Sequence, residues 1–332
     1  MSKKPSKPAP SFWLHFMAGG IGGTVGAAVT CPLEVVKTRL QSSLYRAGET
    51  PVGTRNPLAA AWHHVRGVVG LLRTIQQKEG FRALWKGLGP NLIGVVPARA
   101  INFSVYSQCK YHYAAFNGGT ENSVVHMFSA ATASMTTSIV TNPIWLVKTR
   151  MQLQSEDPAR RSLQRYRNSF HCAYMVVKEE GIRGLYRGLS ASFLGMAEPT
   201  LQFVMYEYFK KSVLDRKRAA AERKGRSTED VSLDWLQTFG VAAAAKLIAA
   251  VVAYPHEVIR TRMRQTPVAG QLKYTGLMQT ASLILREEGP AALYGGMTAH
   301  LMRVVPNAAI LFFCYETVIA VGARMAPPQK RA

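Results

Sequence analysis

Apolar stretches long enough to cross a bilayer recur along this chain. Residues 12–30 and 123–147 carry no formal charge, and residues 235–254 carry only Lys246. About 20 apolar residues are needed to span the hydrocarbon layer of a membrane. Each stretch is followed by an amphipathic segment and then by another apolar stretch. The pattern predicts six membrane-spanning helices, and an even number places both termini on the same side.

The predicted helices fall into three groups, each with a long first helix, a short amphipathic helix and a long closing helix. We expect first helices at 12–42, 122–153 and 233–264, short helices at 60–79, 168–180 and 274–287, and closing helices at 90–112, 190–212 and 297–320. The expected fold is an all-α membrane protein with one transmembrane domain, residues 1–332, and repeats at 12–112, 122–212 and 233–320. A large soluble protein with buried core helices is the alternative.

A motif within each first helix shows that the grouping is a true repeat. Residues 32–39 read Pro-Leu-Glu-Val-Val-Lys-Thr-Arg, residues 143–150 read Pro-Ile-Trp-Leu-Val-Lys-Thr-Arg, and residues 255–262 read Pro-His-Glu-Val-Ile-Arg-Thr-Arg. The motifs begin 111 and 112 residues apart, so the chain is a tandem triplication. A proline inside a helix removes a hydrogen bond and bends the axis. We therefore expect three equivalent bends that draw these helix ends together around a pseudo-threefold axis.

A second motif precedes the closing helix of every repeat, at 79–87, 180–188 and 288–296. It reads acid-Gly, then an aromatic residue six positions after the acid, then a base and a glycine. The third copy has Gly295 where the others have Lys86 and Arg187. Two linked motifs found three times in the same order exclude coincidence.

The strongly basic composition points to an anionic partner. The formal net charge is +22 and the sequence pI is near 10.1, which favours nucleic acid, acidic lipid or a polyanionic solute. A nucleic-acid-binding module gathers basic side chains on one face with aromatic residues between them. Here many basic residues recur at matching repeat positions beside apolar spans. A basic soluble nucleic-acid-binding protein is therefore disfavoured, and we expect no nucleic-acid partner.

The sequence offers no pattern for catalysis or for a bound metal. The four cysteines are widely separated, without Cys/His ligand spacing. No nucleophile–base pair and no phosphate-cradling loop is found, so we expect no enzyme activity, no cofactor and no metal. Residues 1–10 lack the apolar core of a secretory signal and the amphipathic Arg pattern of a transit peptide. The charged run at 215–226 is interpreted as a solvated loop or a contact to acidic lipid.

The two linked motifs, present three times over nearly the whole chain, resemble those of the mitochondrial carrier family. The resemblance implies a six-helix pseudo-threefold bundle in the inner mitochondrial membrane, with both termini toward the intermembrane space. It also implies a monomer that contacts acidic phospholipid such as cardiolipin. Such carriers open a central cavity alternately to the two sides of the membrane and thereby exchange solutes.

The resemblance assigns the charged residues of the first motif to a matrix gate. In this family the acid of one repeat pairs with the base of another, and these pairs close the matrix side of the cavity. Carried over to this sequence, Glu34 pairs with Lys148 and Glu257 pairs with Lys37. Charges inside a membrane are costly unless they are paired or wet, which fits such a role.

The third pair of the matrix gate is broken. Trp145 replaces the acid that would face Arg260, so two salt bridges are expected instead of three. The family's brace position beneath the bridges holds Gln41 and Gln152 in two repeats and Arg264 in the third. Only two braces are therefore expected.

The closing helices carry the family's cytoplasmic counterpart, an aromatic-acid-x-x-base motif. Lys110 is expected to pair with Glu207, and Lys210 with Glu316. Both members of the third pair are lost, with Ser107 and Ile319 at the two positions. The implied cytoplasmic gate comprises Tyr106, Lys110, Tyr206, Glu207, Lys210, Tyr315 and Glu316.

The family's substrate contacts lie midway along the closing helices. By position they are Gly94, the pair Gly195-Met196, and Arg303. A glycine followed by an aliphatic residue at the second point is associated in this family with nucleotides. Arg303 suits a phosphate because a guanidinium offers several fixed donors, and Gly94 leaves room for a bulky base. Plain helix packing is the alternative for Gly195-Met196.

Helical spacing places two further bases in the cavity. Lys246 stands eleven residues before Glu257, which is about three helical turns, so both project from nearly the same face, about 16 Å apart along the axis. Arg99 has the same spacing before the gate base of its own helix. With Arg303 these bases would form a basic collar for phosphates. Glu198, in the same layer, is expected to form a structural pair with Arg99, to pair with another of these bases, or to bind a proton.

Tryptophan at position 145 resembles the branch of the family that carries pyrimidine nucleotides, NAD, FAD and folate. The strings at 142–145 and 254–258, together with Lys246, look most like the pyrimidine nucleotide carriers. We therefore expect a transporter that exchanges pyrimidine nucleoside di- and triphosphates by alternating access. A carrier of NAD, FAD or folate is the alternative within the branch.

Overall fold

The computed structural model describes residues 12–45, 57–155, 157, 166–223, 233–267 and 271–325, and most of them are helical. The first helices are α1 (Phe12–Gln41), α4 (Ser123–Leu153) and α8 (Trp235–Met263). The short helices are α2 (Pro57–Glu79), α5 (Ser169–Gly184) and α9 (Leu277–Glu287). The closing helices are α3 (Leu88–Phe116), α7 (Ala197–Arg223) with a preceding turn α6 (Leu189–Leu194), and α10 (Met297–Met325).

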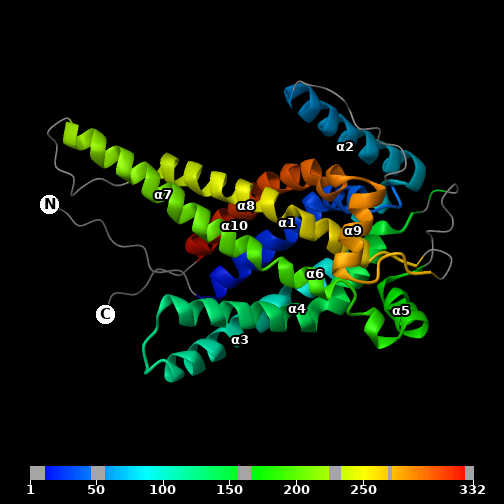
Figure 1. The fold of residues 1–332 in the computed structure, drawn as a ribbon, viewed down its shortest axis with the longest axis horizontal. Helices are drawn as coiled ribbons and strands as arrows, with labels where there is room; N and C mark the ends of the chain where they lie inside the picture. Colours follow the sequence, from blue (N-terminus) through cyan, green and yellow to red (C-terminus); the bar gives the residue numbers. More distant parts are fainter. Residues whose placement is uncertain are drawn as a thin grey trace.

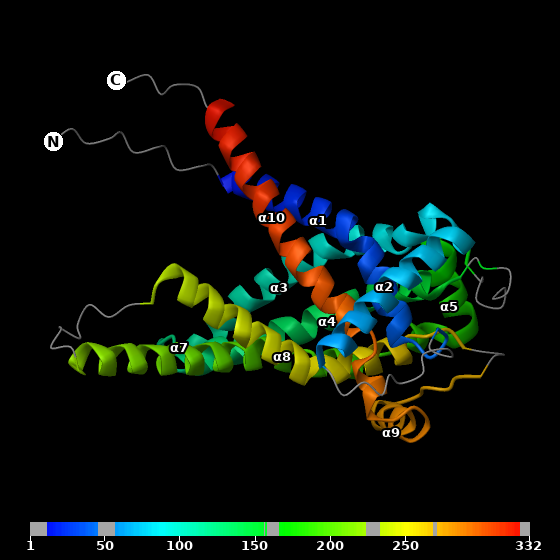
Figure 2. The ribbon, with the colours of Figure 1, turned by 90° about the horizontal axis from the view of Figure 1, so that it is seen from above.

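The long helices run side by side along the molecule, with α2, α5 and α9 gathered at one end (Figures 1 and 2). The start of α1 and the end of α10 lie at the opposite end. The tightest packing joins α1 with α10, α3 with α4, and α7 with α8. Each of these pairs links one repeat to another, so the three repeats close into a single bundle.

Three of the long helices are apolar enough to be recognised as membrane spans: Ala18–Gln41, Trp235–Met263 and the segment Pro290–Val321 that contains α10. Helix α4 is as long but more polar. Its Ser134, Thr137, Ser138 and Thr141 line the central cavity. Polar residues that face a wet interior lower the hydropathy of a span without exposing polar groups to lipid.

Two glycines allow α1 to pack closely on α10. A Cβ atom on Gly22 would lie 3.0 Å from the carbonyl oxygen of Leu311, and one on Gly26 would lie 2.9 Å from Oδ1 of Asn307. Small residues spaced four apart on one helix face are a common means of helix contact in membranes.

The closing part of the second repeat differs from the single helix expected at 190–212. The chain breaks between α6 and α7, and the amides of Gly195 and Met196 bond to the carbonyls three residues earlier, at 3.1 Å each. Pro199 has no N–H to bond the carbonyl of Gly195, four residues before it. The missing bond alone does not explain the interruption, because α3 and α10 also contain prolines, Pro97 and Pro306, and are continuous.

The interpretation of the charged run at 215–226 as a loop is wrong for the part that the structure describes. Residues 215–223 continue helix α7 to Arg223. Alanine, lysine, arginine and glutamate are strong helix formers, which explains why the helix outlasts its apolar part. Residues 224–226 lie outside the described residues.

The glycines of the second motif hold backbone conformations that other residues rarely adopt. All six have φ between +70° and +83°: Gly80, Gly87, Gly181, Gly188, Gly289 and Gly296. The later glycine of each repeat also approaches a neighbouring first helix. A Cβ atom on Gly87 would lie 2.8 Å from Cγ of Gln152, and one on Gly296 would lie 2.8 Å from the carbonyl oxygen of Lys37. The motif glycines therefore set how each short segment docks against another repeat.

Candidate functional site

Two ion pairs join first helices from different repeats at the end where α2, α5 and α9 lie, called here the motif end. Lys148 Nζ of α4 lies 2.7 Å from Glu34 Oε1 of α1, and Lys37 of α1 contacts Glu257 of α8. All four side chains are largely buried. The structure thus brings together the two pairs expected from the sequence.

Between α4 and α8, the third repeat interface, no such gate pair is formed among the residues that the structure describes. The indole Nε1 of Trp145 donates a hydrogen bond to Oγ1 of Thr141 at 2.9 Å, within its own helix. Arg260 lies 3.6 Å from Glu257, also within its own helix. The gate therefore contains two bridges between repeats, with an unmatched arginine at the third position.

The three brace positions behave differently. Gln41 accepts a hydrogen bond from Thr261 at 2.8 Å and donates to Glu257 at 3.4 Å, so it ties α1 to α8 beneath a bridge. Gln152 accepts from Thr38 at 2.8 Å. Arg264 instead donates to Asn142 at 2.7 Å and to Ser192 Oγ at 3.1 Å.

Sequence reasoning gave no role to the last base of the first motif or to the acid of the second, and the structure joins them. Each arginine forms a bidentate ion pair with the glutamate of its own repeat, and each arginine side chain is at most 1 % exposed. The oxygen–nitrogen distances include 2.8 Å for Arg39 with Glu79, 3.0 Å for Arg150 with Glu180, and 2.6 Å for Arg262 with Glu288. Their constant positions in three repeats were the signal that could have revealed the pairing.

The same arginines also link the repeats to one another. The Nε atom of Arg39 donates to the carbonyl oxygen of Gln152, that of Arg150 to Arg264, and that of Arg262 to Gln41. Each bond runs from one repeat to another, so the three close a ring around the motif end. Removing one partner of a buried ion pair costs about 3–5 kcal/mol, so loss of a glutamate partner of these arginines would destabilise the motif end.

A central cavity of about 420 Å³ lies above the gate, lined by α1, α4, α6, α7 and α8. Volumes of about 300–1,000 Å³ are typical of small-molecule sites. Met196, Glu198 and Arg260 are among its lining residues, with Trp145 in the wall. Polar and charged side chains therefore dominate its surface.

Two predicted substrate contacts have packing partners in this conformation. A Cβ atom on Gly94 would lie 3.0 Å from Ile144 and 3.3 Å from the ring of Trp145, so these side chains fill the space expected for a base. A Cβ atom on Gly195 would lie 2.9 Å from Nε2 of His256. Gly195 and Met196 still line the cavity.

The bases of the predicted collar are not all gathered in one place. Lys246 Nζ lies 2.7 Å from Glu198 Oε1, and Arg303 Nη1 lies 3.6 Å from Glu34 Oε1, so both bases contact acids that line the cavity. Of the alternatives given for Glu198, the pair with Arg99 is not formed, and the pair with another base of the collar, Lys246, is. Arg99 is exposed and lies outside the residues that line the cavity.

The predicted cytoplasmic pairs are not formed. Lys110 Nζ lies 2.9 Å from Glu121, in the loop before α4, and Lys210 lies 3.7 Å from Glu207 of its own helix. Among the described residues no ion pair involves Glu316. The hydroxyl of Tyr106 contacts Nδ1 of His126 at 2.9 Å, and Lys210 Nζ lies 5.8 Å from the ring centre of Tyr206.

One group of side chains has the spacing of metal ligands. Ligand atoms of Glu198, His256 and Glu257 lie within 4.8 Å of one another. Both carboxylates are already engaged, by Lys246 and by Lys37. Lysine side chains in contact with both carboxylates disfavour the binding of a metal cation. The absence of a metal stays a prediction.

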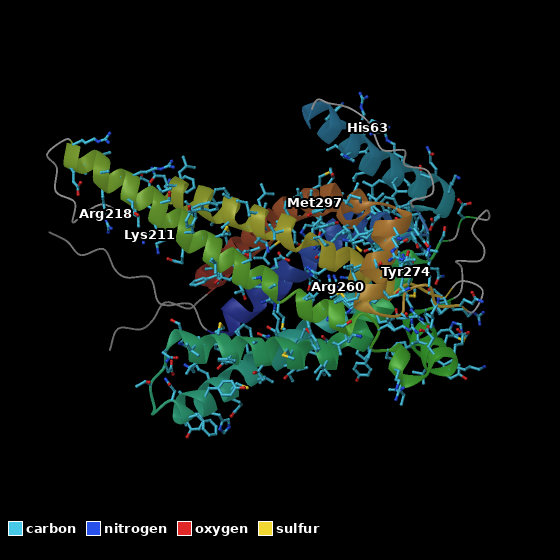
Figure 3. All side chains as sticks on the ribbon, viewed as in Figure 1. His63, Lys211, Arg218, Arg260, Tyr274 and Met297 are labelled. Atoms are coloured by element: carbon cyan, nitrogen blue, oxygen red, sulfur yellow. The ribbon has the colours of Figure 1, made fainter. Side chains whose placement is uncertain are left out.

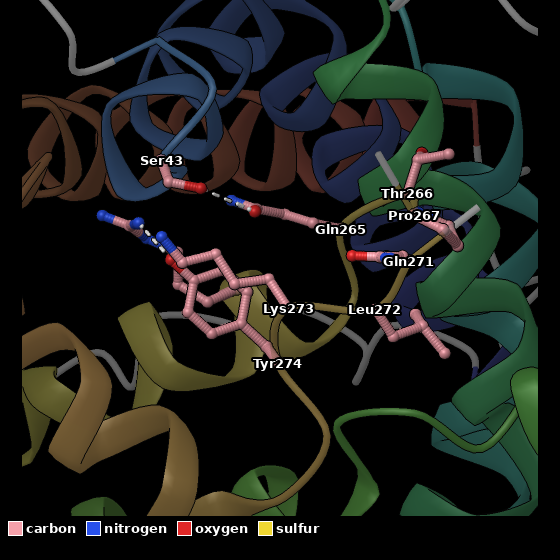
Figure 4. A pocket seen from close by; sticks show the side chains of 9 residues that line it. Ser43, Gln265, Thr266, Pro267, Gln271, Leu272, Lys273 and Tyr274 are labelled. Atoms are coloured by element: carbon pink, nitrogen blue, oxygen red, sulfur yellow. Dashed lines mark hydrogen bonds between the residues drawn. The ribbon is translucent and has the colours of Figure 1, made fainter. Parts of the chain in front are cut away.

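A second pocket lies at the motif end (Figure 4). Its charged side chains are paired, Arg262 with Glu288 and Lys273 with Glu287. The carboxylate of Glu287 raises the pKa of Lys273. Arg262 also donates to the hydroxyl of Tyr274 at 2.9 Å. These contacts give the pocket a structural role.

The fold and the site together define a class of protein. Three repeats enclose a charged cavity that is closed at one end by ion pairs between repeats, which is the arrangement of a membrane carrier. The family model described as "Mitochondrial carrier protein" matches residues 8–116, 119–217 and 231–324. The chain belongs to the mitochondrial carrier family, as the resemblance in its sequence implied.

Its relatives include transporters from yeasts and animals. The chain is 45% identical over 334 residues to the mitochondrial pyrimidine nucleotide transporter RIM2 of Saccharomyces cerevisiae, covering 96% of this chain and 88% of the relative. It is 50% identical to mitochondrial carrier protein rim2 of Schizosaccharomyces pombe, covering 94% and 90%. It is 43% identical to solute carrier family 25 member 33 of Homo sapiens, covering 92% and 94%.

Proposed function

We propose that this protein exchanges pyrimidine nucleoside di- and triphosphates across the inner mitochondrial membrane by alternating access. The observation that carries the proposal is the surplus of positive charge around the central cavity. Four bases and three acids line it: Lys37, Lys148, Arg260 and Arg264, and Glu34, Glu198 and Glu257. Two further bases, Lys246 and Arg303, contact Glu198 and Glu34 from outside the lining, so that the group as a whole has an excess of three positive charges. A polyphosphate of similar opposite charge would neutralise this excess.

The pyrimidine part of the proposal rests on the relatives. The mitochondrial pyrimidine nucleotide transporter RIM2 of Saccharomyces cerevisiae is 45% identical to this chain over nearly its whole length. Trp145 and the strings around Asn142 and Tyr254 favour the same choice. A carrier of NAD, FAD or folate is the second candidate, since Trp145 is typical of that wider branch.

Transport would depend on the two ends of the bundle being closed by ion pairs in turn. The ion pairs at the motif end are formed, whereas the pairs expected at the far end are not. A nucleotide would enter from the far end and contact the bases of the cavity. It would bind the conformation between the two end states more tightly than the resting conformation, and so lower the barrier between them. No covalent step is required, so we propose a transporter without enzyme activity.

We further propose that the motif end faces the matrix and that both termini face the intermembrane space. This orientation follows the family pattern, in which the first-motif gate closes the matrix side. The basic surface would attract acidic phospholipid such as cardiolipin, and the carrier would act as a monomer. Labelling of single introduced cysteines from each side of intact mitoplasts tests the orientation.

The test of function is exchange by purified protein in liposomes. Labelled UTP or CTP should accumulate in liposomes loaded with unlabelled pyrimidine nucleotide, and much less in empty liposomes. No uptake above protein-free liposomes would contradict the proposal.

A ligand panel separates the candidate substrates. A ligand that binds only the folded state raises the melting temperature by mass action. UTP, CTP and TTP should stabilise the protein in detergent, whereas NAD, FAD and folate should not. Stabilisation by NAD, FAD or folate alone would favour the second candidate.

A further inference from the structure

The third gate base differs from the other two in how its charge is used. The side chains of Lys37 and Lys148 are 10% and 12% exposed, and each contacts a carboxylate from another repeat. The side chain of Arg260 is 30% exposed and lines the cavity. Among the described residues it makes no side-chain hydrogen bond, and its neighbouring acid, Glu257, already contacts Lys37. Arg260, labelled near the middle of the molecule in Figure 3, thus keeps its donors available.

Trp145 prevents an internal partner from reaching this position. Its indole is held by a hydrogen bond to Thr141 and lies against Gly94. Lys148 Nζ lies 5.2 Å from its ring centre, within reach of a cation–π contact. The ring occupies the place of the missing acid and has no hydrogen-bond acceptor for a guanidinium. Apart from Glu257, whose carboxylate Lys37 also contacts, the open side of Arg260 is the cavity.

Two further arginines also have hydrogen-bond donors without a partner. The Nε atoms of Arg264 and Arg303 are buried and have no hydrogen-bond partner among the described residues. Arg264 donates only to the neutral side chains of Asn142 and Ser192. Buried cations without a carboxylate are costly, so this part of the cavity would be stabilised by an added anion.

We propose that Arg260 binds the terminal phosphate of the nucleotide, which occupies the position of the missing third gate carboxylate. The inference rests on the proposed function and deepens it. A guanidinium presents forked donors that match the oxygens of a phosphate. Because Arg260 lies on the gate, at the floor of the cavity, a triphosphate reaches it and a monophosphate does not. The unpaired gate arginine would thereby distinguish nucleotides by the length of their phosphate chain.

The first test compares the affinities of UTP and UMP for Arg260→Gln, Arg260→Lys and the wild type, from the dose dependence of thermal stabilisation in detergent. Losing a charge-assisted hydrogen bond should weaken UTP binding about tenfold in Arg260→Gln. UMP binding should change by less than about threefold, and Arg260→Lys should be intermediate. An unchanged ratio of UTP to UMP affinity in Arg260→Gln overturns the proposal.

The second test restores the missing acid. Trp145→Glu supplies a carboxylate for Arg260, and Trp145→Gln removes the same ring without adding charge. Trp145→Glu should weaken UTP binding about tenfold relative to Trp145→Gln, and adding Arg260→Gln to Trp145→Glu should cause little further loss. Equal UTP affinities of Trp145→Glu and Trp145→Gln would overturn the proposal.

Inorganic tripolyphosphate separates this inference from the proposed function. If UTP and CTP fail to stabilise the wild type, the pyrimidine assignment is wrong, but tripolyphosphate still reports on Arg260. Its binding to the wild type should fall about tenfold in Arg260→Gln. Equal binding to both proteins, or no binding to the wild type, would contradict the phosphate site.

Discussion

The two ends of the helix bundle both carry charged side chains, but these side chains pair differently at the two ends. At the motif end, two gate pairs connect the repeats, and three buried arginine–glutamate pairs each lie within one repeat. At the far end, Lys110 contacts a loop and Lys210 contacts its own helix. The motif end is therefore closed by bonds between repeats, whereas the far end has none of its expected pairs.

The difference separates two kinds of ion pair within the motif end itself. The arginine–glutamate pairs connect a first helix to the short segment of the same repeat and are almost fully buried, so they hold each repeat together. The gate pairs connect different repeats and border the cavity. In the proposed transport cycle only the second kind breaks, and the far-end pairs form in exchange.

The largest expected effect is the loss of a buried arginine–glutamate pair. Glu180→Ala leaves Arg150 buried without its acid and should lower the free energy of unfolding by about 3–5 kcal/mol. Glu316→Ala, at the far end, is the control and should change it by less than about 0.5 kcal/mol. Thermal unfolding in detergent measures both. Equal losses of unfolding free energy in the two variants would contradict the claim that the motif end is held together more strongly than the far end.

Arg303→Ala tests the cavity. It removes a base that contacts Glu34 beside the gate, and we expect nucleotide exchange in liposomes to be abolished. Lys273→Ala, which alters a surface pair of the motif end, should retain exchange. Full activity of Arg303→Ala would refute its role in binding phosphate.

Charge reversal tests the far end. Lys110→Glu should reduce exchange because it places two acids opposite each other when that end closes. The double variant Lys110→Glu with Glu207→Lys should regain most of the lost rate. Failure of the double variant to recover would show that these residues do not pair at any stage of transport.

The smallest effect is expected for the pair between Lys273 and Glu287. Both side chains are nearly half exposed, and exposed pairs contribute about 0–1 kcal/mol. The pKa of Lys273 is raised in the folded state, so its contribution is present at neutral pH and is lost only at alkaline pH, above the lysine's unfolded pKa. Lys273→Ala should therefore leave the melting temperature nearly unchanged between pH 6 and pH 8. A shift as large as that of Glu180→Ala would contradict this assignment.

The repeat explains how much the sequence could predict. Glu34 with Lys148, Glu257 with Lys37, and the missing partner of Arg260 could all be inferred, because three aligned motifs fix the partner of each charge. The bond between Glu198 and Lys246 could be given only as one of several alternatives, since it depends on how α7 starts after the break at Gly195-Met196. The corresponding segments of the other repeats form the continuous helices α3 and α10, although each also contains a proline, Pro97 and Pro306.

The central claim is that the two ends of the bundle open alternately around a nucleotide. The most direct measurement is the distance between spin labels at Ala114→Cys on α3 and Lys211→Cys on α7, in a transport-active background whose four native cysteines are replaced by serine. Addition of UTP should shift part of the population to shorter distances as the far end closes. A distance distribution that stays unchanged at UTP concentrations that support exchange would contradict the account.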